Sequence, residues 1–302
     1  MTSLKRRAVI TLALAGLAPF ASPVSTASAA PEGAYWRVET MIALPHMRPV
    51  GSGYRMNELR VSATWSNVRG KHWTAFRPMG AKPATAKDEA AWKADGSPTS
   101  WTYRTEGMKV TLSTKPGKGY VGPEGSGKAG FPHYGKLLTY QELQTFPAEP
   151  AALRSRIVAG LRAELEVTAK EESGVPEADK RATFERNLDR SVASAMGYLM
   201  VEKPLPKPVR AAAFQVLKET EGVRAEGSAK DALGRRGQRF ALPVFSAKGQ
   251  AVDEKVLVDP ATFTLLEWDV RSTSNGKPSA KPWRKETFVK VGWTNDKPAI
   301  PS

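Results

Sequence analysis

The chain has 302 residues, with 45 lysines and arginines against 30 aspartates and glutamates, and a formal net charge of +15. It contains no cysteine and three histidines. The lack of cysteine excludes disulfides, thiolate nucleophiles and metal sites ligated by cysteine. A chain of this length can bury a core as one large domain or two small ones.

The N-terminus has the organisation of a secretory signal peptide. Three basic residues at 5–7 precede an apolar stretch at 8–20, and Ala27-Ser28-Ala29 fits the small-x-small pattern of a cleavage site. The apolar stretch is too short to cross a bilayer comfortably. We therefore expect residues 1–29 to be a signal peptide cleaved near Ala29, and the mature chain to be extracytoplasmic without a transmembrane helix. The paired arginines leave the twin-arginine route open beside the general secretory route.

Residues 30–146 show the period-2 alternation of apolar side chains that is typical of half-buried strands. The pattern is clearest over 36–44 and 59–65. Further strands are expected at 71–79 and 100–113, with a turn at Asp95-Gly96 before the last of them. The glycine-rich stretch 115–130 is expected to be a mobile loop.

Residues 147–221 carry apolar side chains at helical spacing, in stripes over 153–165 and 184–199 and in a shorter helix over 209–217. A proline stands near the start of each predicted helix, where its missing N–H costs nothing. These prolines are Pro150, Pro176 and Pro208.

Residues 222–302 return to alternation, most clearly at 240–244 and 289–293. Asp259-Pro260-Ala261-Thr262 predicts a type I turn that joins two strands into a hairpin. Asn275-Gly276 predicts another turn.

Strands, then helices, then strands predict an α+β fold rather than a parallel doubly wound sheet. We expect one domain over residues 30–302. Both ends of the chain would form a curved antiparallel sheet, like a half-barrel, covered by the central helical insertion. No linker rich in Gly, Ser or Pro separates 30–146, 147–221 and 222–302.

Catalytic and cofactor motifs are weak. Residues 122–128 satisfy the G-x-x-x-x-G-K pattern of a phosphate-binding loop, but Ala129 stands where a hydroxyl is needed. The three histidines share no metal-ligand spacing, and no G-x-S-x-G elbow occurs. We expect no catalytic residue, metal or cofactor; a hydrolase acting on the cell wall is kept as an alternative.

Basic side chains form two clusters that could attract an anionic polymer or lipid of the cell envelope. Solubility alone is the other interpretation of this charge. The candidate anion-binding residues are Lys203, Lys207, Arg210, Arg235, Arg236 and Arg239.

Aromatic side chains in the early strands could line a cavity for an apolar ligand if the sheet curves. This interpretation places Trp36 and Trp65 together on the concave face; ordinary core packing is the alternative. The candidate lining residues are Trp36, Val38, Ile42, Leu59, Val61 and Trp65.

Three segments, 138–154, 209–237 ending in Asp231-Ala-Leu-Gly-Arg-Arg-Gly237, and 258–266, resemble an actinobacterial family of exported or membrane-anchored proteins of unknown function. Members are often similar to the extracytoplasmic part of anti-sigma-factor-like proteins. The early strands also resemble, distantly, the half-barrel of lipoprotein carriers. Phe263 departs from the family pattern, because glycine usually follows the Asp-Pro-Ala-Thr turn, and this puts the tight turn in doubt.

These features favour an exported, non-enzymatic protein that senses or binds an envelope component or a protein partner. A carrier of a lipid or other apolar ligand is the first alternative. Nucleic acid is not expected as a partner outside the cell, and the oligomeric state is left open.

Overall fold

The computed structural model describes residues 31–105, 107–123, 128–170, 174–247, 250–274, 277–278 and 284–302. The predicted signal peptide, the turn at Asn275-Gly276 and the middle of the 122–128 motif lie outside the described residues. No described helix is long and apolar enough to cross a membrane.

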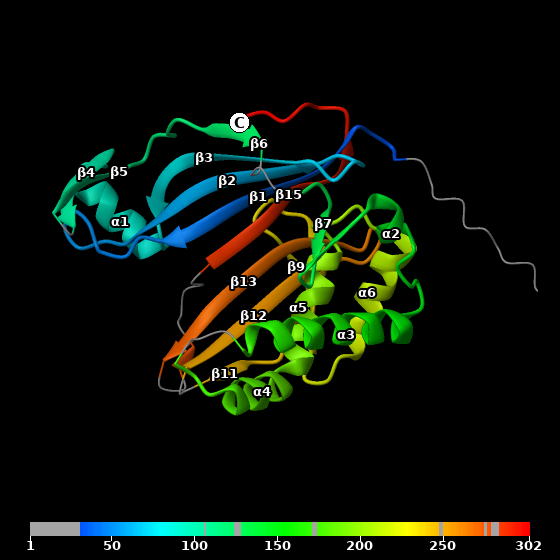
Figure 1. Ribbon diagram of the computed structural model, residues 1–302. Coiled ribbons are helices and arrows are strands. Elements are labelled where there is room, and N and C mark those ends of the chain that lie inside the picture. The colour runs from blue at the N-terminus through cyan, green and yellow to red at the C-terminus, as the bar shows by residue number, and fades with distance from the viewer. Residues whose placement is uncertain are drawn as a thin grey trace, which may run out of the picture.

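Strands from both ends of the chain form one large, curved antiparallel sheet (Figure 1). Its members are β1 (Tyr35–Pro45), β2 (Met56–Ser66), β3 (His72–Pro83), β6 (Tyr120–Pro123), β9 (Arg224–Lys230), β10 (Arg236–Ala241), β11 (Phe245–Ala247), β12 (Gln250–Asp259), β13 (Thr264–Ser274), β14 (Lys277–Pro278) and β15 (Arg284–Thr294). The strand order is β6-β3-β2-β1-β15-β13-β12-β10-β9, with β11 beside β12 and β14 beside β13. The first and last strands of the chain are therefore neighbours at the centre.

The central segment supplies helices that cover one face of this sheet (Figure 1). They are α2 (Tyr140–Gln144), α3 (Pro150–Thr168), α4 (Glu177–Arg186), α5 (Leu188–Leu199) and α6 (Lys207–Glu219). Thr139 begins α2 with a capping box to Glu142, and the Glu149 carboxylate caps α3. The predicted stripe over 184–199 is divided at Asn187, where α4 ends and α5 begins.

The main core lies between these helices and the sheet. Ile157 of α3, Met196 of α5 and Leu217 of α6 are fully buried there. Trp36 and Val38 of β1 belong to the same cluster. The structure therefore confirms the predicted α+β fold, with a curved antiparallel sheet formed by both ends of the chain and helices from its centre.

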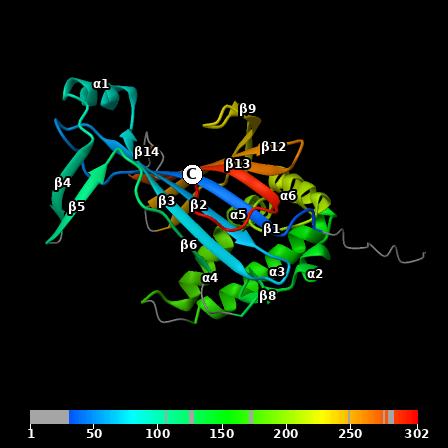
Figure 2. The same ribbon diagram turned by 90° about the horizontal axis from the view of Figure 1, so that it is seen from above.

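A smaller lobe extends from the far end of β2 and β3 (Figure 2). It contains α1 (Ala86–Ala94) and the hairpin of β4 (Ser100–Thr105) and β5 (Met108–Ser113), around a second core cluster with Tyr54 and Met56. A short hairpin of β7 (Phe131–His133) and β8 (Lys136–Leu138) precedes α2. The helix α1 lies in a region whose pattern predicts strands.

The stretch 115–130, predicted to be a mobile loop, contains the edge strand β6, which pairs with β3. Its far end is also held, because Gly130 donates its backbone N–H to the Gly70 carbonyl over 2.9 Å. Gly70 has a φ of 70°, and an added Cβ would lie 2.3 Å from the Gly130 nitrogen. That close approach of two backbones requires glycine at position 70.

The predicted hairpin of β12 and β13 is formed, with its turn at residues 260–263. Phe263 adopts a left-handed φ of 54°, and its N–H donates to the Asp259 carbonyl over 2.9 Å. The Asp259 carboxylate accepts from the Ala261 N–H and the Thr262 hydroxyl. The turn therefore closes although phenylalanine, rather than glycine, occupies its left-handed position.

Candidate groove at a fork in the sheet

The sheet forks between β13 and β15. Their pairing begins with Val270 opposite Arg284 and ends with Glu267 opposite Thr287. On its other edge β15 pairs with β1 as far as Thr294. Within the described chain, residues 288–294 of β15 thus have a strand neighbour on one side only.

Arg235 holds the fork at its closed end. Its guanidinium donates to the Phe288 carbonyl on β15 over 2.6 Å and to the Leu266 carbonyl on β13 over 3.5 Å. Its Nε donates to the Asp231 carboxylate over 2.6 Å, and that carboxylate is fully buried. Arg235 therefore satisfies carbonyl groups of both strands at the point where they separate.

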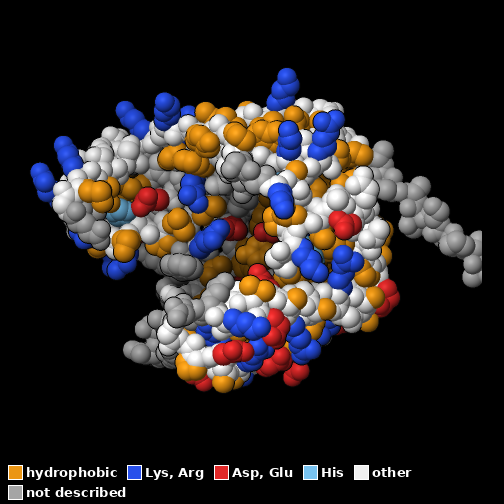
Figure 3. Space-filling view, viewed as in Figure 1, with side chains coloured by type: hydrophobic (Ala, Val, Ile, Leu, Met, Phe, Trp, Pro, Cys, Tyr) orange, Lys and Arg blue, Asp and Glu red, His pale blue; other side chains and the backbone are white. Residues whose placement is uncertain are grey.

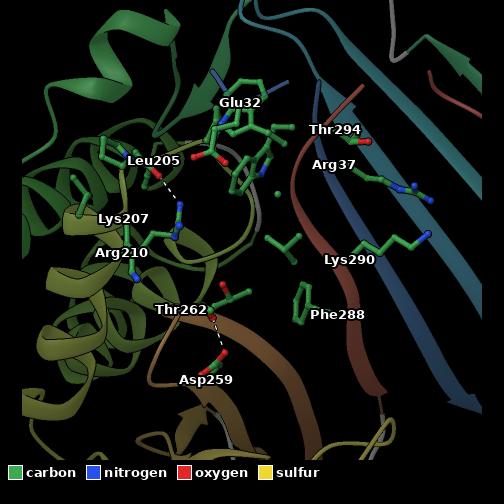
Figure 4. Close-up of a pocket in the computed structure, with 18 of the residues that line it drawn as sticks. Glu32, Arg37, Leu205, Lys207, Arg210, Asp259, Thr262, Phe288, Lys290 and Thr294 are labelled. Atoms are coloured by element: carbon green, nitrogen blue, oxygen red, sulfur yellow. Dashed lines mark hydrogen bonds between the residues drawn. The ribbon is translucent and has the colours of Figure 1, made fainter. Parts of the chain in front are cut away.

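A groove of about 1380 Å³ opens from the fork, between β15 and the segment that leads into α6 (Figure 4). Its floor carries aromatic side chains in edge-to-face contact. The Trp36 and Trp293 rings are 5.9 Å apart between centroids, and the Tyr140 and Trp293 rings are 5.8 Å apart. The groove is large enough for a ligand of many atoms.

Arg210, in the first turn of α6, is the principal cation of the groove (Figure 4). It donates to the Leu205 carbonyl over 2.6 Å, and its guanidinium carbon lies 5.7 Å from the Trp36 ring centre. Its Nε is buried without a hydrogen-bond partner among the described residues. Burial lowers the pKa of Arg210, and the charge of Glu32 partly opposes this shift. The side chain still carries its charge at neutral pH.

The other charges around the groove differ in their availability. Lys207 lines it and stands 6.0 Å from the Phe263 ring centre. Lys290 lies on β15 with its side chain directed away from the cavity (Figure 4). Neither lysine, nor Arg210, forms an ion pair within the part of the chain that is described, but the carboxylate of Glu32, which also lines the groove, acts on Arg210 through its charge. Asp259 is engaged in its own turn.

The structure brings together three of the six predicted anion-binding residues, namely Lys207, Arg210 and Arg235, at the groove. Arg235 is committed to Asp231 and to the fork. The remaining three lie outside the groove lining: Lys203 is 3.6 Å from Glu202, Arg239 is 3.6 Å from Glu267, and Arg236 is exposed on β10.

The expectation that Trp36 and Trp65 share the concave face is wrong. Arg37 pairs with Trp65, and Trp36 pairs with Ser66. Directly opposed residues share a face, so Trp65 lies with Arg37 on the face away from the main core, and the Arg37 guanidinium stacks 5.3 Å from its ring centre.

The same register divides the whole predicted apolar lining between the two faces, with Trp36, Val38 and Ile42 on one face and Leu59, Val61 and Trp65 on the other. Of these six residues, Trp36 lines the groove and the others do not. Groove residues that the sequence reasoning missed include Tyr140, Lys290 and Trp293. Alternation identified the strand that carries Trp293, but nothing in the pattern indicated that this strand has an open edge.

Several ionisable groups outside the groove have partners of their own, among them Glu286, which forms an ion pair with Arg284. His46 contacts the Glu58 carboxylate through Nδ1 at 2.6 Å. Burial raises the pKa of Glu286, which also feels the charge of Glu202. The described residues contain no group of three or more His, Asp or Glu side chains arranged to hold a metal ion.

A comparison of the chain with protein-family models, with curated proteins and with solved structures found no match. Any functional assignment therefore depends on the geometry and charge of the groove itself.

Proposed function

We propose that this protein is an exported, non-enzymatic binding protein of the cell envelope, and that its groove takes an anionic envelope component or an anionic part of a protein partner. The observation that carries the proposal is Arg210. A charged guanidinium is largely buried there, over an aromatic floor, and within the described chain no carboxylate forms an ion pair with it.

Burying an unpaired charge costs stability, and proteins usually pair such a group or bind something against it. The Leu205 carbonyl meets part of the hydrogen-bonding capacity of Arg210, but Nε has no partner among the described residues. An anionic group entering the groove would neutralise the charge of this guanidinium. In Figure 3, Lys and Arg side chains predominate over the upper strands, while acidic side chains lie around the central hollow.

A second candidate is a carrier of a lipid or other apolar ligand. The aromatic floor of Trp36, Tyr140 and Trp293 favours it, because such rings bury large apolar area. In this second candidate, binding would depend on the aromatic floor more than on the charge of Arg210. A cell-wall hydrolase has no comparable observation in its favour.

The proposal is tested by native mass spectrometry of mature protein taken from its own envelope, followed by identification of what is retained. Arg210→Gln should lose the bound anion, whereas Lys87→Gln should keep it. Lys87 is an exposed lysine of α1 and serves as the matched control. Retention of the same molecule by Arg210→Gln, or metal-independent turnover of a wall polymer, would contradict the proposal.

A further inference from the structure

The wall of the groove formed by β15 is a strand edge rather than a strand face. Successive side chains of a strand point to opposite faces, so a cavity beside one face meets every second residue. The strand β13 follows this rule, contributing Thr264 and Leu266. By contrast, β15 contributes every residue from Phe288 to Thr294. The groove therefore runs along the backbone of β15.

That edge carries backbone groups that need partners. In an antiparallel sheet, alternate residues direct their N–H and C=O groups to one neighbouring strand and the residues between them to the other. Past Thr287 the side of β15 that faces β13 has no paired strand in the described chain. The Phe288 carbonyl already accepts a hydrogen bond from Arg235. The edge beyond it extends about 20 Å, at roughly 3.3 Å per residue, which suits a strand of six or seven residues.

The charges beside the edge indicate what such a strand would carry. A strand added next to β15 would direct alternate side chains to the two faces of the sheet. On the inner face it would approach Arg210 and Lys207. On the outer face it would neighbour Lys290, which points that way (Figure 4). These three cations form no ion pair within the described part of the chain, so acidic side chains on either face of the added strand would meet a cation without a direct ion-pair partner. Glu32 lines the same groove and acts on Arg210 through its charge, so it would oppose an acidic side chain placed beside it.

We propose that the groove binds an extended acidic polypeptide segment, which pairs as an added strand with residues 289–294 of β15. This inference rests on the proposed function and names the class of its ligand. Backbone hydrogen bonds would supply affinity without regard to sequence, and Arg210, Lys207 and Lys290 would select acidic side chains.

The probe is a blocked octapeptide in which pairs of glutamates alternate with pairs of valines, so that both faces of an extended chain carry acid. Binding to the mature protein is measured by isothermal titration calorimetry. Since a hydrogen bond to a charged group contributes about 1.5–3 kcal/mol, Arg210→Gln should weaken binding by roughly tenfold or more. Lys290→Gln should weaken it less, and Lys87→Gln should leave it unchanged. A peptide with lysine in place of glutamate should not bind.

Two N-methylated peptides test the strand pairing itself. One carries methyl groups on the amides of odd residues and the other on those of even residues. Only the amides of alternate peptide residues point towards β15. Methylation of those amides should weaken binding by at least about tenfold, whereas methylation of the other amides should leave the affinity unchanged. Equal effects of the two methylation patterns would overturn the pairing.

The outcomes separate this inference from the proposed function. If a lipid or wall polymer is recovered with the protein and released by Arg210→Gln, while the acidic peptide does not bind, the peptide inference is wrong and the proposed function stands. If neither the recovered molecule nor the peptide responds to Arg210→Gln, both are wrong.

Discussion

The guanidinium of Arg210 lies over the ring of Trp36 at the N-terminal turn of α6, 5.7 Å from the ring centre. This position is doubly unfavourable for a cation, because the side chain is desolvated and the helix dipole places partial positive charge at the same end. The contact with the indole ring offsets part of that cost. This unfavourable position is the reason that we propose a ligand-binding role for Arg210.

It follows that Arg210→Met should change stability little. Methionine keeps the packing over Trp36 and removes the desolvated charge, while the Leu205 carbonyl loses its donor. Because these two effects oppose each other, we expect the free energy of unfolding to change by less than about 1 kcal/mol. Urea denaturation monitored by circular dichroism would measure the free energy of unfolding. A loss above about 1 kcal/mol would instead show that Arg210 serves the fold, as the destabilisation typical of a core position does.

Arg235 should behave in the opposite way. Arg235→Ala would leave the buried Asp231 carboxylate without its cation and two strand carbonyls without their donor. Breaking a fully buried ion pair from one side costs about 3–5 kcal/mol, and the partial exposure of Arg235 makes the expected cost smaller than that. We expect a large drop in melting temperature, measured by differential scanning calorimetry. Arg236, the next residue, is exposed at the start of β10 and provides the control. Arg236→Ala should change the melting temperature little.

Phe263 offers a test of backbone strain at the β12–β13 turn. The left-handed conformation costs a non-glycine residue about 1–2 kcal/mol. Phe263→Ala and Phe263→Gly both remove the ring that packs on Phe214 at 5.7 Å, but only glycine relieves the strain. Phe263→Gly should therefore be the more stable of the two by about 1 kcal/mol, the reverse of the usual order. Equal unfolding free energies would contradict the turn geometry.

His133 should make stability depend on pH. Burial, together with the charges of Lys203 and Arg156, lowers its pKa from 6.5 to about 4. Between these values the unfolded chain binds more protons than the folded one, so stability falls as the pH is lowered from about 6.5 towards 4 and loses nothing further below that. His133→Phe keeps a ring against Phe146 and should lose this contribution. Urea midpoints of both proteins at several pH values would measure the difference, and parallel curves would count against it.

Much of the fold could be predicted because the period at which apolar residues recur reflects which side of a strand or helix faces the core. The strands around Trp36 and Trp293 and the helices around Ile157 and Leu217 are examples. The helix α1 was missed because none of its residues is buried, so no apolar stripe marks it. The signals that α1 does carry are local: the Thr85 cap, acidic residues in the first turn and Lys93 in the last turn.

The groove was beyond sequence reasoning for a different reason. Alternation shows which residues of each strand share a face with one another. Whether Trp36 and Trp65 share a face depends on the register between β1 and β2, and a shift of one residue reverses the answer. The observed register pairs Arg37, not Trp36, with Trp65. The fork likewise depends on where β13 and β15 cease to pair. The clusters of basic residues did place Lys207 and Arg210 among the candidate anion-binding residues, while their location beside an open strand edge is a property of the tertiary fold.

The adjacency of β1 and β15 also has a kinetic consequence. Ala34 donates to the Asn295 side chain across 261 residues of sequence, and the two strands pair along their whole common length. Contacts at such separation require an expensive loop closure and slow the search for the native state. The edge of β1 cannot be covered until the last strand has been synthesised. That edge must therefore stay unpaired, or be kept from associating with other chains, until residues 284–294 have been synthesised.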